Sequence, residues 1–256
     1  MVKIAQINRQ RLRLAAQQIL ARNPSGLMPC YSVNEFPKSG GTWLCQMLAE
    51  GLGVPYVSHS FPPLKSSVFH MHTMRSTGVK NMIVMWRDGR DVMVSWYHHC
   101  LFEQAQHNAG FVSKVRSHFG HRDYDNVYKH LPDFIEYTFT QAHYPRFTWG
   151  DFVRQWHGRN DVVYARYEDL LTRPAKELLR ICHALKTQDT LDIETATHIA
   201  EQYSFQNQTG RKAGDERKSN FLRKGIAGDW KNNFSEHAVE VFDFYAAKEM
   251  KLLGYQ

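Results

Sequence analysis

Apolar residues occur along this chain in short stretches and in longer stretches with helical spacing. Residues 82–86 are an unbroken apolar run between polar and charged neighbours, and 31–36, 66–71 and 161–167 are short extended stretches in which polar residues interrupt the apolar ones. Short apolar runs with such boundaries are typical of strands that are buried in an α/β protein. We therefore predict four strands, with 82–86 (Met-Ile-Val-Met-Trp) as a buried central one.

The longer runs predict helices that alternate with these strands. After the first strand, Trp43, Leu44, Met47, Leu48 and Leu52 recur at helical spacing, and Pro174 stands where the first turn of another helix tolerates proline. Alternating strands and helices indicate an α/β fold with a mostly parallel sheet flanked by helices. A length of 256 residues fits a single domain over residues 1–256. Further helices are expected over 92–101, 149–156, 175–185, 191–203 and 235–253.

Two regions lack this alternation. Residues 1–30 predict a helical extension, with a surface helix over about 5–21; this stretch is rich in arginine and contains no acid, so an organelle transit peptide is the alternative. Residues 101–148 mix glycine, histidine and aromatic residues, and we interpret them as broken helices that form a lid on the acceptor side.

Composition narrows the class of protein. A net charge of +7 indicates an anionic ligand, a nucleic acid or a membrane surface, and the absence of a long Lys/Arg block argues against nucleic acid. The four cysteines are far apart, which argues against a zinc knuckle, a redox motif or a disulfide framework. Since no apolar run approaches about 20 residues and no secretory signal is visible, we expect a cytoplasmic protein.

Residues 34–43 read Asn-Glu-Phe-Pro-Lys-Ser-Gly-Gly-Thr-Trp, between the first strand and the first helix. A strand, a glycine turn and a helix form a phosphate or sulfate site, because the first helix amides and the helix dipole favour an anion. In the nucleoside triphosphate loop the lysine follows the glycines, whereas here Lys38 precedes both of them. A nucleotide kinase, which also needs an aspartate for magnesium, is therefore a weaker alternative.

Two further basic loops accompany this one. Arg87 follows the strand 82–86, and Arg223-Lys224-Gly225 lies in a glycine-containing loop near the C-terminus. Ligands of open α/β sheets bind outside the carboxyl ends of the strands. The loops that carry Lys38 and Arg87 can therefore converge on a doubly anionic ligand.

The order of these blocks resembles the cytosolic-type sulfotransferases, which move a sulfuryl group from 3′-phosphoadenosine 5′-phosphosulfate (PAPS) to a hydroxyl or amine and release adenosine 3′,5′-bisphosphate (PAP). The resemblance covers residues 36–234 and implies a P-loop-like, nucleotide-kinase-like three-layer architecture. It is carried by four blocks: Pro37–Trp43, Arg87–His98, Tyr167-Glu168-Asp169-Leu170 with Pro174, and Arg223-Lys224-Gly225 with Gly228-Asp229-Trp230-Lys231-Asn232.

This resemblance implies a role for each matching residue. The 5′ end of PAPS is expected on the first block, the 3′-phosphate on the arginine, lysine and serine residues of the second and fourth blocks, and the adenine on aromatic rings. A guanidinium suits a phosphate because its planar fork donates two hydrogen bonds, and an aromatic ring stacks on any base. The alternative for Phe205 is simple packing. The implied cofactor residues are Lys38, Ser39, Gly40, Gly41, Thr42, Trp43, Arg87, Ser95, Tyr167, Phe205, Arg223, Lys224 and Gly225.

For catalysis, the resemblance implies a histidine base at the end of the strand 66–71, where the sequence is Phe69-His70-Met71-His72. We expect His72 to be the base and leave His70, which stands where the family usually has lysine, as the alternative. Lys38 is expected to stabilise charge on the leaving phosphate, and Ser95 to restrain Lys38. No acidic metal cluster is visible, so no metal is expected.

The acceptor is not identified by these motifs. The variable loops carry aromatic residues that indicate an apolar or aromatic alcohol, phenol or amine: Phe61, Phe102, Phe111, Tyr137, Phe139, Tyr144 and Phe147. The family's common dimer motif is absent, so a homodimer remains open. The absence of a signal anchor argues against the Golgi relatives. Because His70 replaces a lysine, a catalytically impaired PAPS- or PAP-binding protein of the same fold is the alternative function.

Overall fold

The computed structural model describes residues 29–57, 66–75, 80–102, 109–120, 123–141, 144–185 and 191–255. The helix expected over residues 5–21 lies outside these ranges, as does the aromatic residue Phe61. Part of the expected lid region also lies outside them.

The chain divides into two compact units. The first unit contains the residues up to Glu35, Gly40–Trp86 and Gly158–Tyr203, and the second contains Phe36–Ser39, Arg87–His157 and the residues from Ser204 onward. The loop between the first strand and the first helix is thus shared, since residues 36–39 belong to the second unit.

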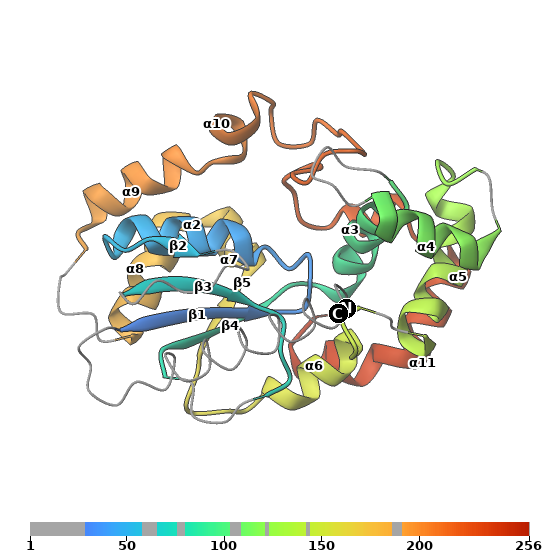
Figure 1. Cartoon of the computed structure of the whole chain (residues 1–256), viewed down its shortest axis with the longest axis horizontal. Coiled ribbons are helices and arrows are strands. Elements are labelled where there is room, and N and C mark those ends of the chain that lie inside the picture. The colour runs from blue at the N-terminus through green and yellow to red at the C-terminus, as the bar shows by residue number, and fades with distance from the viewer. Residues whose placement is uncertain are drawn as a thin grey trace, which may run out of the picture. The chain divides into compact units, whose positions relative to one another are not determined.

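The first unit is built on a parallel sheet of five strands in the order β2-β3-β1-β4-β5 (Figure 1). Every paired strand is parallel to its neighbour. This arrangement confirms the predicted α/β class and places 82–86 inside the sheet. The strands are β1 (Cys30–Glu35), β2 (Tyr56–Val57), β3 (Ser67–Met71), β4 (Met82–Trp86) and β5 (Val163–Arg166).

The helices of this unit are α2 (Gly41–Gly51), α7 (Tyr167–Thr172), α8 (Pro174–Ala184) and α9 (Ile193–Gln202). Figure 1 shows α2 along one face of the sheet, where it contacts β1 and β3. The apolar positions that predicted α2, including Leu44, Met47 and Leu48, are fully buried in the core between α2, α8 and the sheet. Burial of such side chains contributes about 1.5–3 kcal/mol each.

Three details differ from the sequence prediction. The fourth strand ends at Arg166, and Tyr167 is the first residue of α7 instead of the last residue of a strand. The strand β2 was not predicted, because two residues are too short for any periodicity and its pairing partner Val68 is distant in sequence. The short helix α10 (Phe205–Thr209) in the second unit was also not predicted.

The second unit is helical. Its longest helix, α11 (Glu236–Leu252), packs on α5 (Val127–Thr140) and α6 (Trp149–Trp156). Ser235 caps α11 through the amide of Ala238, which confirms the predicted N-cap. No helix in the described ranges combines the length and the apolar character that crossing a bilayer requires. The remaining elements are α3 (Gly89–Leu101), α4 (Ala109–Phe119) and the 3₁₀-helix η1 (Asp229–Asn232).

The helix α3 begins at Gly89, three residues before the predicted start. The Asp88 carboxylate accepts a hydrogen bond from the Arg90 amide and so caps the first turn. Gly89 is required at this place, because a Cβ here would lie 2.7 Å from the Phe242 ring. Arg87 directly precedes this cap, so the start of α3 fixes the position of its backbone.

All four cysteines are free and buried. The prediction that Cys45 and Cys182 are buried thiols is confirmed, and burial raises the pKa of both.

Candidate active site

The two candidate base residues meet at the carboxyl edge of the first unit's sheet. Strands β1 and β3 are parallel neighbours, with Val33 paired to His70, so the residues that follow both strands lie together. His70 Nε2 lies 3.0 Å from Glu35 Oε1, and His72 Nδ1 lies 2.9 Å from the backbone oxygen of Glu35. The two imidazole rings contact each other edge to face, with centroids 4.6 Å apart.

The hydrogen bond of His72 decides its tautomer. A backbone carbonyl can only accept, so Nδ1 must carry the proton that it donates to Glu35. In a neutral ring the other nitrogen, Nε2, then carries the lone pair. This is the protonation state that a general base needs.

Asn34 fixes the segment that carries His72. Its side-chain nitrogen donates to the backbone oxygen of Thr73 at 3.0 Å, and its side-chain oxygen accepts from the Thr73 amide at 2.9 Å. Two hydrogen bonds between one side chain and one backbone position hold that position firmly. His72 is therefore positioned by Asn34 and by Glu35 from the neighbouring strand.

Glu35 was not among the residues expected in the site. Its side chain is 3% exposed, and its Oε2 accepts a hydrogen bond from the Gly41 amide at the start of α2. Burial by itself raises the pKa of Glu35, but the hydrogen bond and charge of His70, the charge of His72 and the Gly41 amide outweigh it, so the pKa is lowered. One feature of the sequence could have pointed to Glu35: it is the first acidic residue of the chain and it ends a buried strand.

Glu35, His70 and His72 offer ligand atoms that lie within 4.8 Å of one another, a separation that a metal ion can span. Both carboxylate oxygens of Glu35, however, already accept hydrogen bonds from protein donors. We therefore describe the cluster as a hydrogen-bonded group and assign no metal to it.

Gly40 and the rings beside it form the next part of the first unit's site. Gly40 has φ +101°, and a Cβ there would lie 2.6 Å from the Tyr167 ring. Trp43 packs edge to face on Tyr167, with centroids 6.1 Å apart, and Trp43 Nε1 is buried with no hydrogen-bond partner among the described residues. The structure thus brings together three of the expected cofactor residues and leaves a buried donor beside them.

Lys38 and Arg87 lie together in the second unit. Arg87 Nη1 donates to the backbone oxygen of Lys38 at 3.0 Å, and the Lys38 ammonium lies 3.8 Å from the centre of the Phe221 ring. The Ser39 hydroxyl is 1% exposed and donates to the backbone oxygen of Phe36. This hydrogen bond joins two residues of the loop, on either side of Lys38.

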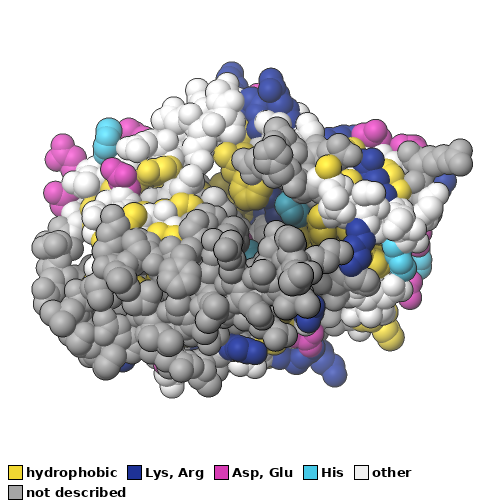
Figure 2. Space-filling view, viewed as in Figure 1, with side chains coloured by type: hydrophobic (Ala, Val, Ile, Leu, Met, Phe, Trp, Pro, Cys, Tyr) yellow, Lys and Arg dark blue, Asp and Glu magenta, His cyan; other side chains and the backbone are white. Residues whose placement is uncertain are grey.

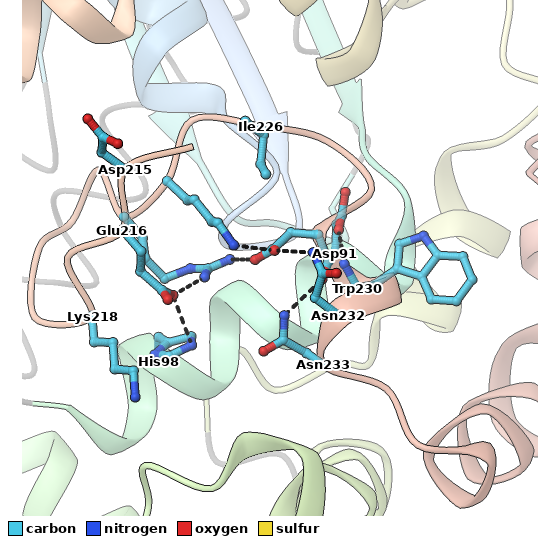
Figure 3. Close-up of polar contacts among 12 residues, drawn as sticks. Asp91, His98, Asp215, Glu216, Lys218, Ile226, Trp230, Asn232 and Asn233 are labelled. Atoms are coloured by element: carbon cyan, nitrogen blue, oxygen red, sulfur yellow. Dashed lines mark hydrogen bonds and ion pairs between the residues drawn. The ribbon is translucent and has the colours of Figure 1, made fainter. Parts of the chain in front are cut away.

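Arg223 and Lys224 share one carboxylate in the C-terminal loop. Arg223 Nη2 and Lys224 Nζ each lie 2.6 Å from Asp229, and Arg223 also pairs with Glu216. Burial raises the pKa of Asp229, but the hydrogen bonds of Lys224 and Arg223 outweigh it and bring the pKa to about 2. Figure 3 shows Glu216 in this network, with a dashed line that also joins it to His98.

Asp91 anchors the same loop to α3. Its two carboxylate oxygens accept hydrogen bonds from the amides of Gly228 and Trp230 at 2.6 and 2.9 Å (Figure 3). Arg87 Nη2 adds a bond to the backbone oxygen of Ile226 at 3.3 Å. Two residues at the start of α3 therefore hold a loop that is more than 130 residues away in sequence.

Phe205 and Gly225 touch each other. A Cβ on Gly225 would lie 2.3 Å from the Phe205 ring, and the Arg211 guanidinium lies 4.9 Å from the centre of the same ring. Phe205 is half-buried, and its role as an adenine contact stays a prediction. Figure 2 shows Lys and Arg side chains gathered over the loop that follows α10, where Lys212 and Arg217 are exposed.

Thr42 and Ser95 occupy the expected elements. Thr42 lies half-buried in the first turn of α2, and Ser95 lies half-buried on α3. Neither residue is drawn into the contacts described above, so their roles stay predictions.

A cavity lined by aromatic rings lies within the second unit. Its volume is about 10 Å³, roughly the room that one water molecule needs, so the rings almost fill it. Six further residues complete its wall: Phe36, Trp96, Cys100, Val115, Thr138 and Pro145. Four of the aromatic residues predicted to face an acceptor line it: Phe111, Tyr137, Tyr144 and Phe147. Phe139 instead stacks on Tyr245 of α11, with centroids 5.0 Å apart.

The family model of the sulfotransferase domain matches residues 54–254 of this chain. The chain therefore belongs to the sulfotransferase domain family. The matched stretch includes the histidine pair and the Arg87 and Arg223 blocks, whereas the loop around Lys38 lies before it. This membership decides against the nucleotide kinase alternative.

Individual relatives agree with the family. Sulfotransferase 1E1 of Cavia porcellus is 24% identical over 262 residues, which cover 84% of this chain and 81% of that protein. The fold is similar to that of mouse sulfotransferase SULT7A1 complexed with PAP, with a TM-score of 0.63 and 20% identity over 87% of this chain and 84% of that one. It is also similar to retinol dehydratase in a complex with retinol and PAP, with a TM-score of 0.54 and 16% identity over 94% of this chain and 86% of that one.

Proposed function

We propose that this protein transfers the sulfuryl group of PAPS to a hydroxyl or amine of a small, largely apolar acceptor. The observation that carries the proposal is the contact of His72 Nδ1 with the Glu35 backbone oxygen, since a neutral ring that donates from Nδ1 has its lone pair at Nε2. Family membership supports the reaction class, and two solved relatives contain PAP.

In this reaction the acceptor oxygen or nitrogen attacks sulfur, and a new bond to sulfur forms. The bond between sulfur and the phosphate oxygen breaks, and its electron pair leaves with PAP. The acceptor proton passes to Nε2 of His72, and Lys38 stabilises the negative charge on the departing phosphate. Catalysis then rests on positioning and electrostatics, as in phosphoryl transfer.

The residues present fit the donor molecule. In the first unit, Gly40, Gly41 and Thr42 would hold the 5′ end, and Trp43 and Tyr167 would contact the adenine. The tight approach of Gly40 to Tyr167 and the unpaired Trp43 Nε1 support this assignment. In the second unit, Lys38 and Ser39 would complete the 5′ loop, Phe205 would contact the adenine, and the 3′-phosphate would bind to Arg87, Ser95, Arg223, Lys224 and Gly225.

Arg223 and Lys224 already pair with Asp229 and Glu216. A 3′-phosphate would therefore bind to cations that these carboxylates also contact. Because the carboxylates hold the Arg223 and Lys224 side chains in place before the ligand arrives, less conformational entropy is lost on binding.

The acceptor would bind at the aromatic cluster of the second unit, whose rings would have to separate, because the cavity between them has room for about one water molecule. Its lining by Phe111, Tyr137, Tyr144 and Phe147 supports a flat or apolar molecule, because aromatic walls offer little hydrogen bonding. The retinol dehydratase structure contains retinol, a largely apolar alcohol of this general kind.

Calorimetric titration with PAP tests the proposal. We expect the wild-type protein to bind PAP and Arg87→Ala to bind it about 100-fold more weakly, because a charged phosphate contact is lost. Arg173→Ala, which removes an exposed arginine paired with Asp169, is the matched control and should bind like the wild type.

His72→Gln should bind PAP normally and lose sulfuryl transfer from labelled PAPS to a panel of phenols and alcohols. Absence of PAP binding by the wild type would reject the proposal. Binding without transfer to any acceptor would favour the impaired binding protein, which the replacement of a lysine by His70 supports as the second candidate.

A further inference from the structure

Arg211 opens the loop that leads to Arg223 and Lys224. It directly follows Gly210, which ends α10 with a left-handed backbone at φ +69°. The Arg211 side chain is half-buried, and all of these residues belong to the second unit.

The guanidinium of Arg211 donates hydrogen bonds to three backbone carbonyls. Nη1 donates to the oxygens of Asp215 and Arg223 at 2.6 and 2.9 Å, and Nη2 donates to the oxygen of Leu222. A guanidinium can reach several acceptors at once because its donors are fixed in a planar fork. One side chain therefore joins the start of the loop to residues 222–223, near its end.

Backbone hydrogen bonds join the same two stretches of the loop. The Gly214 amide donates to the oxygen of Lys224 at 2.9 Å, and the Arg217 amide donates to the oxygen of Arg223 at 3.1 Å. The Arg223 oxygen thus accepts from both the Arg217 amide and the Arg211 side chain. Removal of the guanidinium would take a charged donor from each of its three carbonyls, and hydrogen bonds to charged groups are the stronger ones.

The same guanidinium contacts the Phe205 ring. Its central carbon lies 4.9 Å from the ring centre, a distance at which a cation is attracted to an aromatic ring. Phe205 in turn packs so closely on Gly225 that a Cβ on Gly225 would overlap the ring. Arg211 therefore contacts both the ring expected at the adenine and the backbone of the arginine expected at the 3′-phosphate.

We propose that Arg211 is a positioning residue for the donor nucleotide, which holds the backbone of residues 222–223 and the Phe205 ring in one arrangement. This assignment rests on the proposed function, in which Phe205 contacts the adenine and Arg223 binds the 3′-phosphate. Since the ribose joins adenine and 3′-phosphate in one small molecule, the groups that bind them must stand at a matching separation. Arg211 sets that separation before the nucleotide arrives, which lowers the conformational cost of binding.

Calorimetric titration of the full chain with PAP tests this role. Arg211→Lys keeps the positive charge and replaces the planar fork by a single nitrogen. We expect it to bind PAP about tenfold more weakly than the wild type, since one ammonium cannot hold three carbonyls and the ring together. Arg217→Lys, at an exposed arginine of the same loop, is the matched control and should bind like the wild type. Wild-type affinity in Arg211→Lys would overturn the proposal.

Steady-state kinetics separate positioning from general stability. In Arg211→Lys the KM for PAPS should rise about tenfold while kcat at saturating PAPS changes less than about twofold, because the contacts of Arg211 are with residues that bind the nucleotide. A variant that melts at a lower temperature with an unchanged KM would mean that Arg211 is merely structural.

A double-mutant cycle shows whether Arg211 acts through Arg223. The loss of PAP affinity on Arg223→Gln should be smaller in the Arg211→Lys background than in the wild type, because the single variant has already displaced that arginine. Additive losses would contradict a role that acts through Arg223.

Amide hydrogen exchange tests the loop without any nucleotide. The Gly214 and Arg217 amides should exchange faster in Arg211→Lys, because the stretch that accepts their hydrogen bonds is the one that Arg211 holds. The Gly228 and Trp230 amides, which bind to α3, should exchange as in the wild type. Unchanged exchange at Gly214 and Arg217 would overturn the proposal.

If Arg211→Lys does not fold, Arg211→Gln, which keeps one planar donor group, carries the same tests. Failure of the wild type to bind PAP would reject the proposed function, whereas hydrogen exchange would still decide whether Arg211 holds the loop. The two failures are thus distinguishable.

Discussion

At the scale of single residues, three histidines of this protein differ in the chemical group that each one contacts. His72 is held by a carbonyl, His70 is held by a carboxylate, and His98 has no hydrogen-bond partner among the described residues for either ring nitrogen. Three histidines of identical intrinsic chemistry therefore have three different environments. The family resemblance ranked His72 above His70 as the base, and that ranking stays a prediction.

His98 leads to a prediction about stability and pH. It is 2% exposed, and burial together with the charges of Arg223 and Lys218 lowers its pKa to about 3. The Glu216 carboxylate, 3.8 Å away, is beyond hydrogen-bond distance and already pairs with Arg223, so it does not charge the ring (Figure 3). Because the folded pKa is depressed, the unfolded chain takes up a proton as the pH falls below 6.5 and the folded chain does not.

We therefore expect His98 to reduce the free energy of unfolding by about 2 kcal/mol between pH 7 and pH 5. Urea denaturation at both pH values measures this loss, and His98→Leu should remove it. His157→Leu, at an exposed histidine, should keep the wild-type pH dependence. Equal slopes in the wild type and His98→Leu would contradict the prediction.

At the scale of elements, the junction of β1 and α2 shows how a strand end, a glycine and a helix start cooperate. Glu35 ends the strand and accepts a hydrogen bond from the Gly41 amide, which begins the helix. Gly40, directly before that helix, packs against the Tyr167 ring. The strand, glycine turn and helix were all predictable from periodicity and glycine content. The hydrogen bond between the Glu35 carboxylate and the first amide of the helix was not predictable. A motif gives the order of residues along the chain and does not say which side chain contacts which amide.

Gly40 allows a sharp test of this junction. Gly40→Ala combines a left-handed backbone (φ +101°) with a Cβ 2.6 Å from Tyr167, whereas Gly53 also has positive φ (+60°) but nothing within 4 Å of a Cβ. Gly53→Ala should cost about 1 kcal/mol of stability, and Gly40→Ala about 3 kcal/mol, because the clash adds to the backbone strain. Chemical denaturation of both variants measures the difference. Similar costs at both positions would mean that the Tyr167 ring moves aside freely.

At the scale of the whole molecule, the chain passes between its two compact units five times, at residues 35/36, 39/40, 86/87, 157/158 and 203/204. Neither unit is a continuous stretch of sequence. Because each unit is made of separate segments, its fold is complete only when the segments of the other unit that connect them are also in position. The single domain over residues 1–256 stays a prediction, as do the cytoplasmic location and a homodimer.

Differential scanning calorimetry tests the single domain. We expect one transition whose calorimetric and van't Hoff enthalpies agree, since interleaved segments couple the two units. PAP at 100 times its dissociation constant should stabilise the fold by about 2.7 kcal/mol and raise Tm by roughly 5–10 °C. A chelator should leave Tm unchanged. Two separate transitions, with only one shifted by PAP, would show that the units unfold independently.

The sequence by itself determined the α/β class, four of the five strands of the sheet, the glycine loop and the family resemblance. These features depend on local periodicity and on short blocks of residues, and both can be detected without knowing which segments touch. The tertiary structure alone decided that Glu35 reaches Gly41 and His70, that Asp91 holds the loop of Gly228 and that Phe111, Tyr137, Tyr144 and Phe147 line one cavity. Those contacts depend on the packing of segments that are distant in sequence, and no periodicity records that packing.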